Sequence, residues 1–263
     1  MKRPILLLFS GLALVVTACG HSEDPANSSL MSTAPSLEGA RSIIAQDSGN
    51  RYPLAIGTRW AYDGVERASF HQDGRLEFGP WKTSRFRVTE EAVRITSIEG
   101  QDYFEIDVRI YDLDGTHPEI PLRDRRYLRQ DRVALYEFPN QGGIGAVEPA
   151  VRLGPAPLRQ ENVRLAYPLH VGASWTARPG SSRTFEVEAI EPIRTGMGVE
   201  PAARVRARSP ELLPSDVSDL EWYGRSGLVR SWKRSYEEHT TPLGVHGTQL
   251  RISEQFLTSF TPG

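Results

Sequence analysis

The chain has 263 residues, with 31 Lys and Arg against 33 Asp and Glu, a hydrophobic fraction of 39% and one cysteine. This near-neutral balance lacks the basic excess of a nucleic-acid-binding protein, so we expect no nucleic-acid partner. A single cysteine excludes an intramolecular disulfide framework, and no run of about 20 apolar residues is present to cross a membrane as a helix.

The N-terminus carries a short apolar run that ends in the cysteine. Two basic residues precede an apolar stretch from Ile5 to Val16, and Thr17-Ala18-Cys19 follows. A run of about a dozen apolar residues has the length of a signal-peptide core. Small residues directly before a cysteine resemble the cleavage site of bacterial lipoproteins. These residues predict a signal peptide over 1–18 and lipidation of Cys19.

The resemblance to bacterial lipoproteins implies a diacylglycerol on the Cys19 sulfur and usually a third acyl chain on the new N-terminus. Each buried methylene contributes about 0.8 kcal/mol, so two or three chains hold a protein on a membrane where one does not. Gly20 replaces the aspartate that favours inner-membrane retention in enterobacteria. The resemblance therefore implies an outer-membrane anchor and a body that faces the periplasm. The alternative is an ordinary secretory signal beside an incidental cysteine.

Residues 19–50 are predicted to be a flexible tether. The stretch from His21 to Ser48 is rich in Ser, Ala, Pro, Asp, Asn and Glu and has few large apolar side chains. Such a composition cannot bury enough surface to offset the entropy of ordering the chain. We expect a single folded body over 51–263. Cleavage removes Lys2 and Arg3, which leaves 29 basic and 33 acidic residues and a formal charge near −4.

Two similar halves are visible in this body. The segment YPLAIGTRW, from Tyr52 to Trp60, recurs as YPLHVGASW from Tyr167 to Trp175. Pro fixes φ, Gly permits a turn and Trp fills a core, so the segment is typical of a turn that enters a strand. Two copies predict one shared core rather than a solenoid. Weaker sequence similarity relates three further pairs of segments: Arg85–Val88 with Thr184–Val187, Tyr103–Tyr111 with Ala203–Arg208, and Arg126–Val133 with Glu221–Val229. We expect quasi-repeats at 51–140 and 165–263, joined by a linker over 141–164.

Alternation with period two predicts antiparallel strands over 103–111, 203–208 and 250–256, each with one apolar and one polar face. Expected hairpin tips are Asp73-Gly74, Glu99-Gly100 and Asp114-Gly115. Helical spacing is confined to one short stretch, from Pro210 to Leu220. The sequence therefore predicts an all-β fold of about 10–12 antiparallel strands, as a half-barrel or a sandwich.

Candidate metal ligands are sparse. Of the six histidines, only His239 and His246 could meet across a hairpin, and we favour ordinary exposed loop positions for them. Asp112-Leu113-Asp114-Gly115 resembles the opening of a calcium loop but lacks its further acidic positions, which favours a hairpin tip. We predict no metal and no cofactor. The remaining histidines are His21, His71, His117 and His170.

Motifs for catalysis are missing as well. Gly142-Gly143-Ile144-Gly145 is followed by helix-breaking residues, so we interpret it as linker rather than a phosphate loop. There is no G-x-S-x-G or S-x-x-K motif, and acylation leaves no free thiol. Glu90 and Glu91 would point to opposite faces of a strand, which is poor geometry for paired acid–base work. We predict a non-enzymatic protein without catalytic residues.

The densest charge feature is the basic run of Arg123, Arg125, Arg126, Arg129 and Arg132, with Asp124 and Asp131 interleaved. We interpret this run as a solvated hairpin face. The alternative is contact with anionic lipid headgroups or with an acidic partner.

The segment from Trp222 to Arg230 (WYGRSGLVR), together with Tyr52–Tyr62, resembles a group of uncharacterised bacterial lipoproteins with a WYxxxGLV hairpin. The match is partial at Gly224 and Ser226, and it implies no activity. More distantly, a lipid-anchored sheet of about eleven strands resembles the lipoprotein-carrier fold, although the covering helices of that fold are missing here. We therefore expect a non-enzymatic binding or scaffold module of the cell envelope. The alternative is a carrier or chaperone for a lipid or another apolar ligand.

Overall fold

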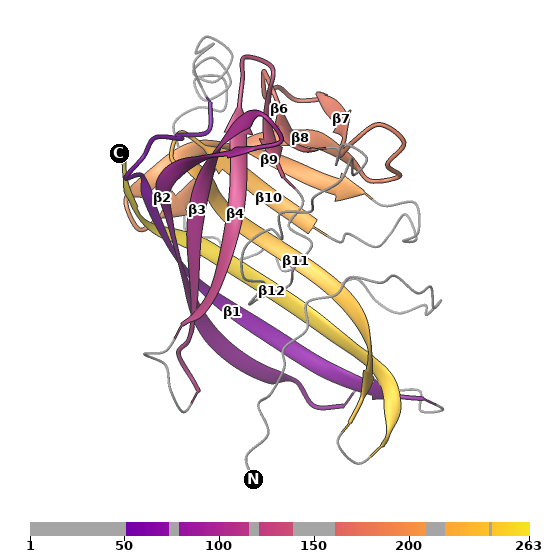
Figure 1. Cartoon of the computed structure of the whole chain (residues 1–263). Helices are drawn as coiled ribbons and strands as arrows, with labels where there is room; N and C mark the ends of the chain where they lie inside the picture. The colour runs from indigo at the N-terminus through magenta and orange to yellow at the C-terminus, as the bar shows by residue number, and fades with distance from the viewer. Residues whose placement is uncertain (1–50, 74–78, 116–120, 139–160, 209–218, 242–243) are drawn as a thin grey trace.

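The computed structural model describes residues 51–73, 79–115, 121–138, 161–208, 219–241 and 244–263, apart from the side chains of Glu237 and His239. These residues form twelve strands and no helix, which confirms the all-β prediction (Figure 1). The strands are β1 (Arg59–Gln72), β2 (Lys82–Ile98), β3 (Gln101–Asp112), β4 (Leu122–Gln130), β5 (Ala134–Glu137), β6 (Asn162–Ala166), β7 (Ser174–Thr176), β8 (Thr184–Thr195), β9 (Gly198–Arg208), β10 (Asp219–Gly224), β11 (Gly227–Thr240) and β12 (His246–Thr261).

All twelve strands belong to one antiparallel sheet, in the order β6-β5-β4-β3-β2-β1-β12-β11-β10-β9-β8-β7. Each strand therefore pairs with its neighbours in sequence, except β6 and β7, which are the two edges, and β1 also pairs with β12 along its whole length. The sheet curls into a nearly closed barrel (Figure 1). Across the remaining gap between β6 and β7, the Val163 amide donates a hydrogen bond of 2.6 Å to the Ala177 carbonyl. The sheet is thus closer to a barrel than to a sandwich.

The two halves of the sequence form the same local structure. Gly57 and Gly172 both have positive φ, 89° and 88°, in the turns before β1 and β7. The Gly57 amide donates to the Ala92 carbonyl at 2.7 Å, and the Gly172 amide donates to the Val187 carbonyl at 2.9 Å. A β-bulge directly follows each acceptor residue, in β2 and β8 respectively. Strands β1–β6 therefore correspond to β7–β12.

This correspondence changes the alignment of the two repeats at one position. The sequence similarity makes Val88 the counterpart of Val187, whereas the turn hydrogen bonds make Ala92 the counterpart of Val187. A shift of four residues keeps a side chain on the same face of a strand, because side chains alternate with period two. An alternating pattern therefore cannot distinguish the two alignments, and the turn hydrogen bonds do.

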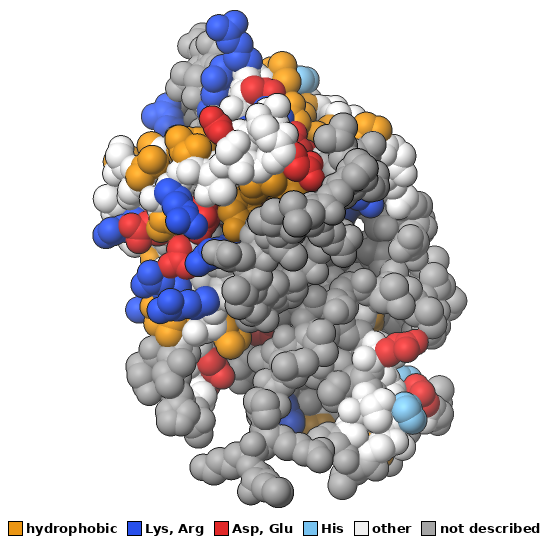
Figure 2. Space-filling view, in the orientation of Figure 1, with side chains coloured by type: hydrophobic (Ala, Val, Ile, Leu, Met, Phe, Trp, Pro, Cys, Tyr) orange, Lys and Arg blue, Asp and Glu red, His pale blue; other side chains and the backbone are white. Residues whose placement is uncertain are grey.

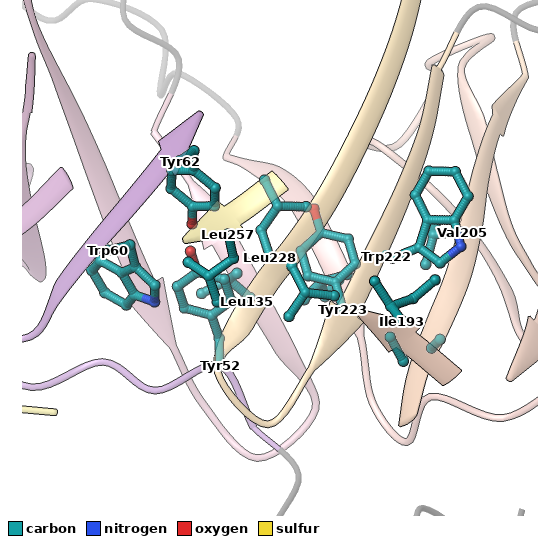
Figure 3. Packing of buried hydrophobic residues seen from close by; sticks show 14 of the residues in the cluster. Tyr52, Trp60, Tyr62, Leu135, Ile193, Val205, Trp222, Tyr223, Leu228 and Leu257 are labelled. Carbon is teal, nitrogen blue, oxygen red and sulfur yellow. The ribbon is translucent and has the colours of Figure 1, made fainter. Parts of the chain in front are cut away.

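One apolar core spans both halves and lies on the inner face of the sheet. Trp60 and Tyr62 of β1 are 2% and 0% exposed, and they pack beside residues from β10–β12 (Figure 3). The Trp60 indole donates a hydrogen bond of 2.8 Å to the Ser226 carbonyl, which ties β1 to the β10–β11 turn. Trp175, the repeat counterpart of Trp60, is only partly buried and stacks on Phe185 with ring centroids 5.5 Å apart.

Several predictions concern residues outside the described ranges. They include the signal peptide over 1–18, Cys19 and the tether over 19–50, His21 and His117, the glycine-rich stretch at 142–145, and most of the linker over 141–164. The helix expected from Pro210 to Leu220 also falls mostly outside, although its last two residues open β10. Within the described residues, no helix of the length and apolar character needed for a transmembrane span occurs.

Candidate functional site

Charged side chains extend into the interior of the barrel at its centre. Glu90 of β2 is 5% exposed and accepts a hydrogen bond of 2.9 Å from Arg126 of β4. Strand β3 lies between them, so the pair reaches across the inner face of the sheet over Ile106, which is buried. The charge of Glu90 raises the pKa of the half-buried Arg126 guanidinium further. The Arg126 guanidinium is thus charged in the folded protein.

A second ion-paired group crosses the gap in the barrel. Arg164 of β6 donates to Glu137 of β5 at 3.2 Å and to Glu221 of β10 at 2.9 Å. The Glu221 carboxylate also accepts a hydrogen bond from the Tyr223 hydroxyl and lies 3.6 Å from the Lys233 ammonium. Burial opposes ionisation of Glu221, yet the charges of Arg164 and Lys233 lower the pKa of its carboxyl to about 2. This cluster joins β5 and β6 of the first half to β10 and β11 of the second half.

The two groups are related by the internal repeat. Ile106 and Val205 are counterparts because they pair with Ala92 and Val187. Arg126 pairs with Ile106, and Glu221 pairs with Val205. The two halves therefore place opposite charges, Arg126 and Glu221, at the same position.

A small cavity lies between these ion pairs. Its volume is about 20 Å³, and its lining combines charged, aromatic and aliphatic residues: Tyr52, Glu90, Arg126, Leu128, Leu135, Glu137, Arg164, Tyr223 and Leu228. This volume suits a single water molecule. We call the cavity and its lining residues the central charge cluster.

Tyr52 of the central charge cluster lies beside a second buried tyrosine, Tyr62. The hydroxyls of Tyr52 and Tyr62 face one another in Figure 3, and burial raises the pKa of both phenols well above the ordinary value. Tyr62 is fully buried, and its hydroxyl has no hydrogen-bond partner among the described residues. Both phenols therefore stay neutral at physiological pH.

A second hollow lies on the barrel wall around β1, β2, β3 and β12, with a volume of about 210 Å³. Its lining includes small residues on neighbouring strands: Ala61, Thr89, Ser259 and Thr261. Two ion pairs line it: Arg59 with Glu91 at 2.8 Å and Arg109 with Asp107 at 2.8 Å. The lining of the hollow is therefore mixed, with ion pairs beside Trp60 and small residues.

The structure separates the two adjacent glutamates as the sequence predicts. Glu90 points inward to Arg126, and Glu91 points outward to Arg59. Asp114 accepts hydrogen bonds from the backbone and the side chain of Arg85, which lower the pKa of its carboxyl. The Asp112 carboxylate caps the amide of Asp114 at 3.1 Å. The Asp112–Gly115 stretch is therefore held at the end of β3, and the rest of the connection to β4 lies outside the described residues.

The basic run does not form one solvated face. Arg123 and Arg125 lie on the outer face of β4, where Arg125 approaches Glu105 at 3.5 Å. Arg126 turns inward to the central charge cluster, and Arg129 makes a two-pronged contact with Glu161. The prediction of a uniform solvated face is therefore wrong for Arg126, because alternation along β4 sends it to the face opposite Arg123 and Arg125. Arg129 shares the outer face, where Glu161 and the Tyr136 ring contact it.

The histidines are dispersed. The His170 Nδ1 lies 3.1 Å from the Pro168 carbonyl, and the His246 Nδ1 lies 2.9 Å from the Thr240 hydroxyl. His71 lies in β1, and the side chain of His239 is outside the described set. Among the residues that the structure describes, no three His, Cys, Asp or Glu side chains are grouped as metal ligands would be.

Sequence reasoning missed Arg164, Glu137 and Glu221 as interior residues. Arg164 stands in the stretch interpreted as linker, and its partner Glu221 is 57 residues away. One signal was available: Glu221 precedes Trp222-Tyr223 on a strand in which alternation predicts that Glu221 and Tyr223 share a face. A glutamate beside a core tyrosine implies a buried partner.

Comparison with known proteins shows limited similarity. No protein family model matches the chain, and no curated protein does. A Bacteroides fragilis protein described as exported, with a YmcC-like fold, aligns with a TM-score of 0.37 and 12% identity over 80% of this chain and 98% of its own. A Parabacteroides distasonis protein assigned as a lipoprotein aligns with a TM-score of 0.35 and 12% identity over 80% and 97%. Ail, the attachment invasion locus protein of Yersinia pestis, aligns with a TM-score of 0.21 and 7% identity over 77% and 99%. At these scores no function passes from these proteins to this chain.

Proposed function

We propose that this chain is a lipid-anchored protein of the bacterial cell envelope, attached through Cys19, whose β body is a non-enzymatic binding or scaffold module. The signal-like run before Cys19 and the composition of residues 20–50 support the anchor and the tether. Gly20 supports the outer membrane, and the tethered body then faces the periplasm.

The central charge cluster is the observation that favours a binding or scaffold module over a carrier. Arg126 and Arg164 are matched by Glu90, Glu137 and Glu221, so the cluster is held by ion pairs. Its cavity of about 20 Å³ is far too small for an acyl chain. A carrier for an apolar ligand needs a larger pocket with a mainly apolar lining. The cluster instead holds the barrel wall in one shape, as suits a module that acts through its outer surface.

The anchor is tested by expressing the full chain beside its Cys19→Ser variant. We expect the wild-type chain to fractionate with the outer membrane and its N-terminal peptide to carry acyl mass on Cys19. The variant should lack both the acyl mass and the cleavage before residue 19. A wild-type peptide with an unmodified Cys19 would refute the anchor.

The carrier alternative is tested on the same preparation. Native mass spectrometry of the anchored protein, released gently in detergent, should give the mass of the protein with its covalent acyl chains and nothing more. Additional mass in steps of a lipid that persists after detergent exchange would favour a carrier over a scaffold.

A further inference from the structure

Seven aliphatic side chains, between 38% and 61% exposed, lie in segments at one end of the barrel. We call them the apolar end: Ile56, Val93, Ile95, Val133, Val171, Met197 and Val199. They occupy the turns before β1 and β7, the last part of β2, the β4–β5 turn and the β8–β9 hairpin. This is the upper end in Figure 1, where the C-terminus is marked, and hydrophobic side chains reach the surface over it in Figure 2.

Hydrogen bonds hold these segments together. The Tyr52 amide donates to the Tyr167 hydroxyl at 3.0 Å, and the Tyr167 amide donates to the Val133 carbonyl at 2.8 Å. The β8–β9 hairpin bends over the sheet, because the Gly196 amide donates to the Leu257 carbonyl of β12 at 2.9 Å. The exposed aliphatic residues therefore belong to one fixed end of the molecule.

Comparison of the two repeats shows that the turns do not need exposed aliphatic side chains in order to fold. Ile56 and Val171 are counterparts, each directly before a glycine with positive φ. Their turns are closed by bonds of 3.1 Å from Thr58 to Ala55 and 2.9 Å from Ala173 to His170. The second position of such a turn accepts most residues, and nothing there requires an aliphatic side chain. Both halves nevertheless carry one, 54% and 49% exposed.

The place where the chain enters the barrel indicates what covers the apolar end. The described body begins at Arg51 and Tyr52, among the segments of the apolar end. Only the 31 residues from 20 to 50 separate it from Cys19. A flexible chain of that length has a root-mean-square span of about 30 Å. An anchor at Cys19 therefore keeps the apolar end closer to the membrane than the opposite end of the barrel.

We propose that the apolar end docks on the lipid bilayer surface, an inference that rests on the proposed anchor at Cys19. Arg51 and Arg132 are exposed at the same end and fit this partner, because cations attract anionic headgroups, whereas Arg59 there is paired with Glu91. Aliphatic side chains between them enter the boundary between headgroups and acyl chains. The barrel then stands on the membrane with its opposite end in the periplasm.

The test uses the full, lipid-anchored chain in vesicles of phosphatidylethanolamine and phosphatidylglycerol at 3:1. A nitroxide is placed on Val171→Cys or Val133→Cys, and the matched control carries it on Trp81→Cys. Trp81 is 48% exposed but precedes β2 at the opposite end. We expect the labels at Val171 and Val133 to collide at least threefold more with oxygen than with a water-soluble nickel complex. The label at Trp81 should show the reverse preference.

A charged double variant, Ile56→Asp with Met197→Asp, should return the Val171 label to the water phase, whereas Leu122→Asp at the opposite end should not. Labels that are equally accessible to water at both ends, on a chain with acylated Cys19, would overturn the docking surface and leave the anchor standing. Protection of the Val171 label by a co-purifying protein, without contact to lipid, would also overturn it. An unmodified Cys19 in the mass spectrum overturns the proposed anchor and this inference with it.

Discussion

The backbone amide of Tyr52 donates a hydrogen bond of 3.0 Å to the hydroxyl of Tyr167, its own counterpart in the second half of the chain. The Tyr167 hydroxyl in turn donates to the Gln130 side chain at 2.9 Å. The first residues of the two repeats therefore contact each other directly. The peptide bond from Tyr167 to Pro168 is cis.

Loss of the Tyr167 hydroxyl should destabilise the protein more than loss of the Tyr62 hydroxyl. Tyr167→Phe removes a group that satisfies a donor and an acceptor, and we expect it to lower the free energy of unfolding by about 1–3 kcal/mol. Tyr62→Phe removes a buried hydroxyl without a partner, so we expect no loss or a gain of up to about 1 kcal/mol. Urea unfolding of both variants measures the difference, and equal losses would contradict it.

Replacing Arg164 should destabilise the protein more than replacing an arginine in an exposed ion pair. Arg164→Met leaves Glu137 and Glu221 without their shared cation, and we expect a loss of about 3–5 kcal/mol. Arg208→Met breaks an exposed pair with Glu186 on β8 and serves as the matched control, with an expected change below about 1 kcal/mol. Denaturation midpoints of the two variants check this, and an Arg164→Met protein as stable as the control would refute the interior role.

Because of Glu221, the free energy of unfolding should fall at acidic pH. Its carboxyl has a pKa of about 2 in the folded protein, below the ordinary value of 4.5. The depressed pKa contributes about 3 kcal/mol above pH 4.5, and this contribution is lost as the pH falls toward 2. Urea unfolding between pH 5 and pH 2 should show a steeper decline for the wild type than for Glu221→Gln. Parallel curves for the two proteins would contradict the assignment.

Two glycines with similar backbone angles should respond differently to alanine. Gly227 has φ of 91°, and a methyl group there would lie 3.0 Å from the Tyr52 ring, whereas Gly244, with φ of 77°, has open space around it. Both substitutions introduce backbone strain of about 1 kcal/mol. We expect Gly227→Ala to lose about 1–3 kcal/mol more, because it also crowds the core beside Tyr52. Thermal unfolding of the pair separates the two effects, and similar shifts would argue against tight packing at Gly227.

Much of the strand content was predictable because it is local. Alternation in the stretch 103–111 predicts β3, which spans Gln101–Asp112, and the two-residue turn Glu99-Gly100 joins β2 to β3 as expected. Both residues of that turn have positive φ. The repeated YPL segment also predicts the equivalence of the two halves. These features depend on neighbouring residues only, so a single sequence contains them.

The closure of the sheet and the central charge cluster were not predictable in the same way. The pairing of β1 with β12 joins residues about as far apart as the described body allows, and no local pattern encodes it. Arg126 lies in a run of arginines, and its inward direction follows from a register with β3 that the sequence alone does not determine. Arg164 and Glu221 meet across the gap between strands that are distant in sequence.

The pairing of β1 with β12 also sets the order in which the sheet can be completed. Strand β12 is synthesised after all the other described strands, yet β1 needs it as a hydrogen-bonded neighbour along its full length. Until then β1 has one unpaired edge, and the two six-strand halves are connected only through the turn at 167–173. Such long-range pairing slows folding and exposes strand edges in the meantime. The edge of β1 that faces β12 therefore stays open for pairing with another strand until the last described strand is synthesised.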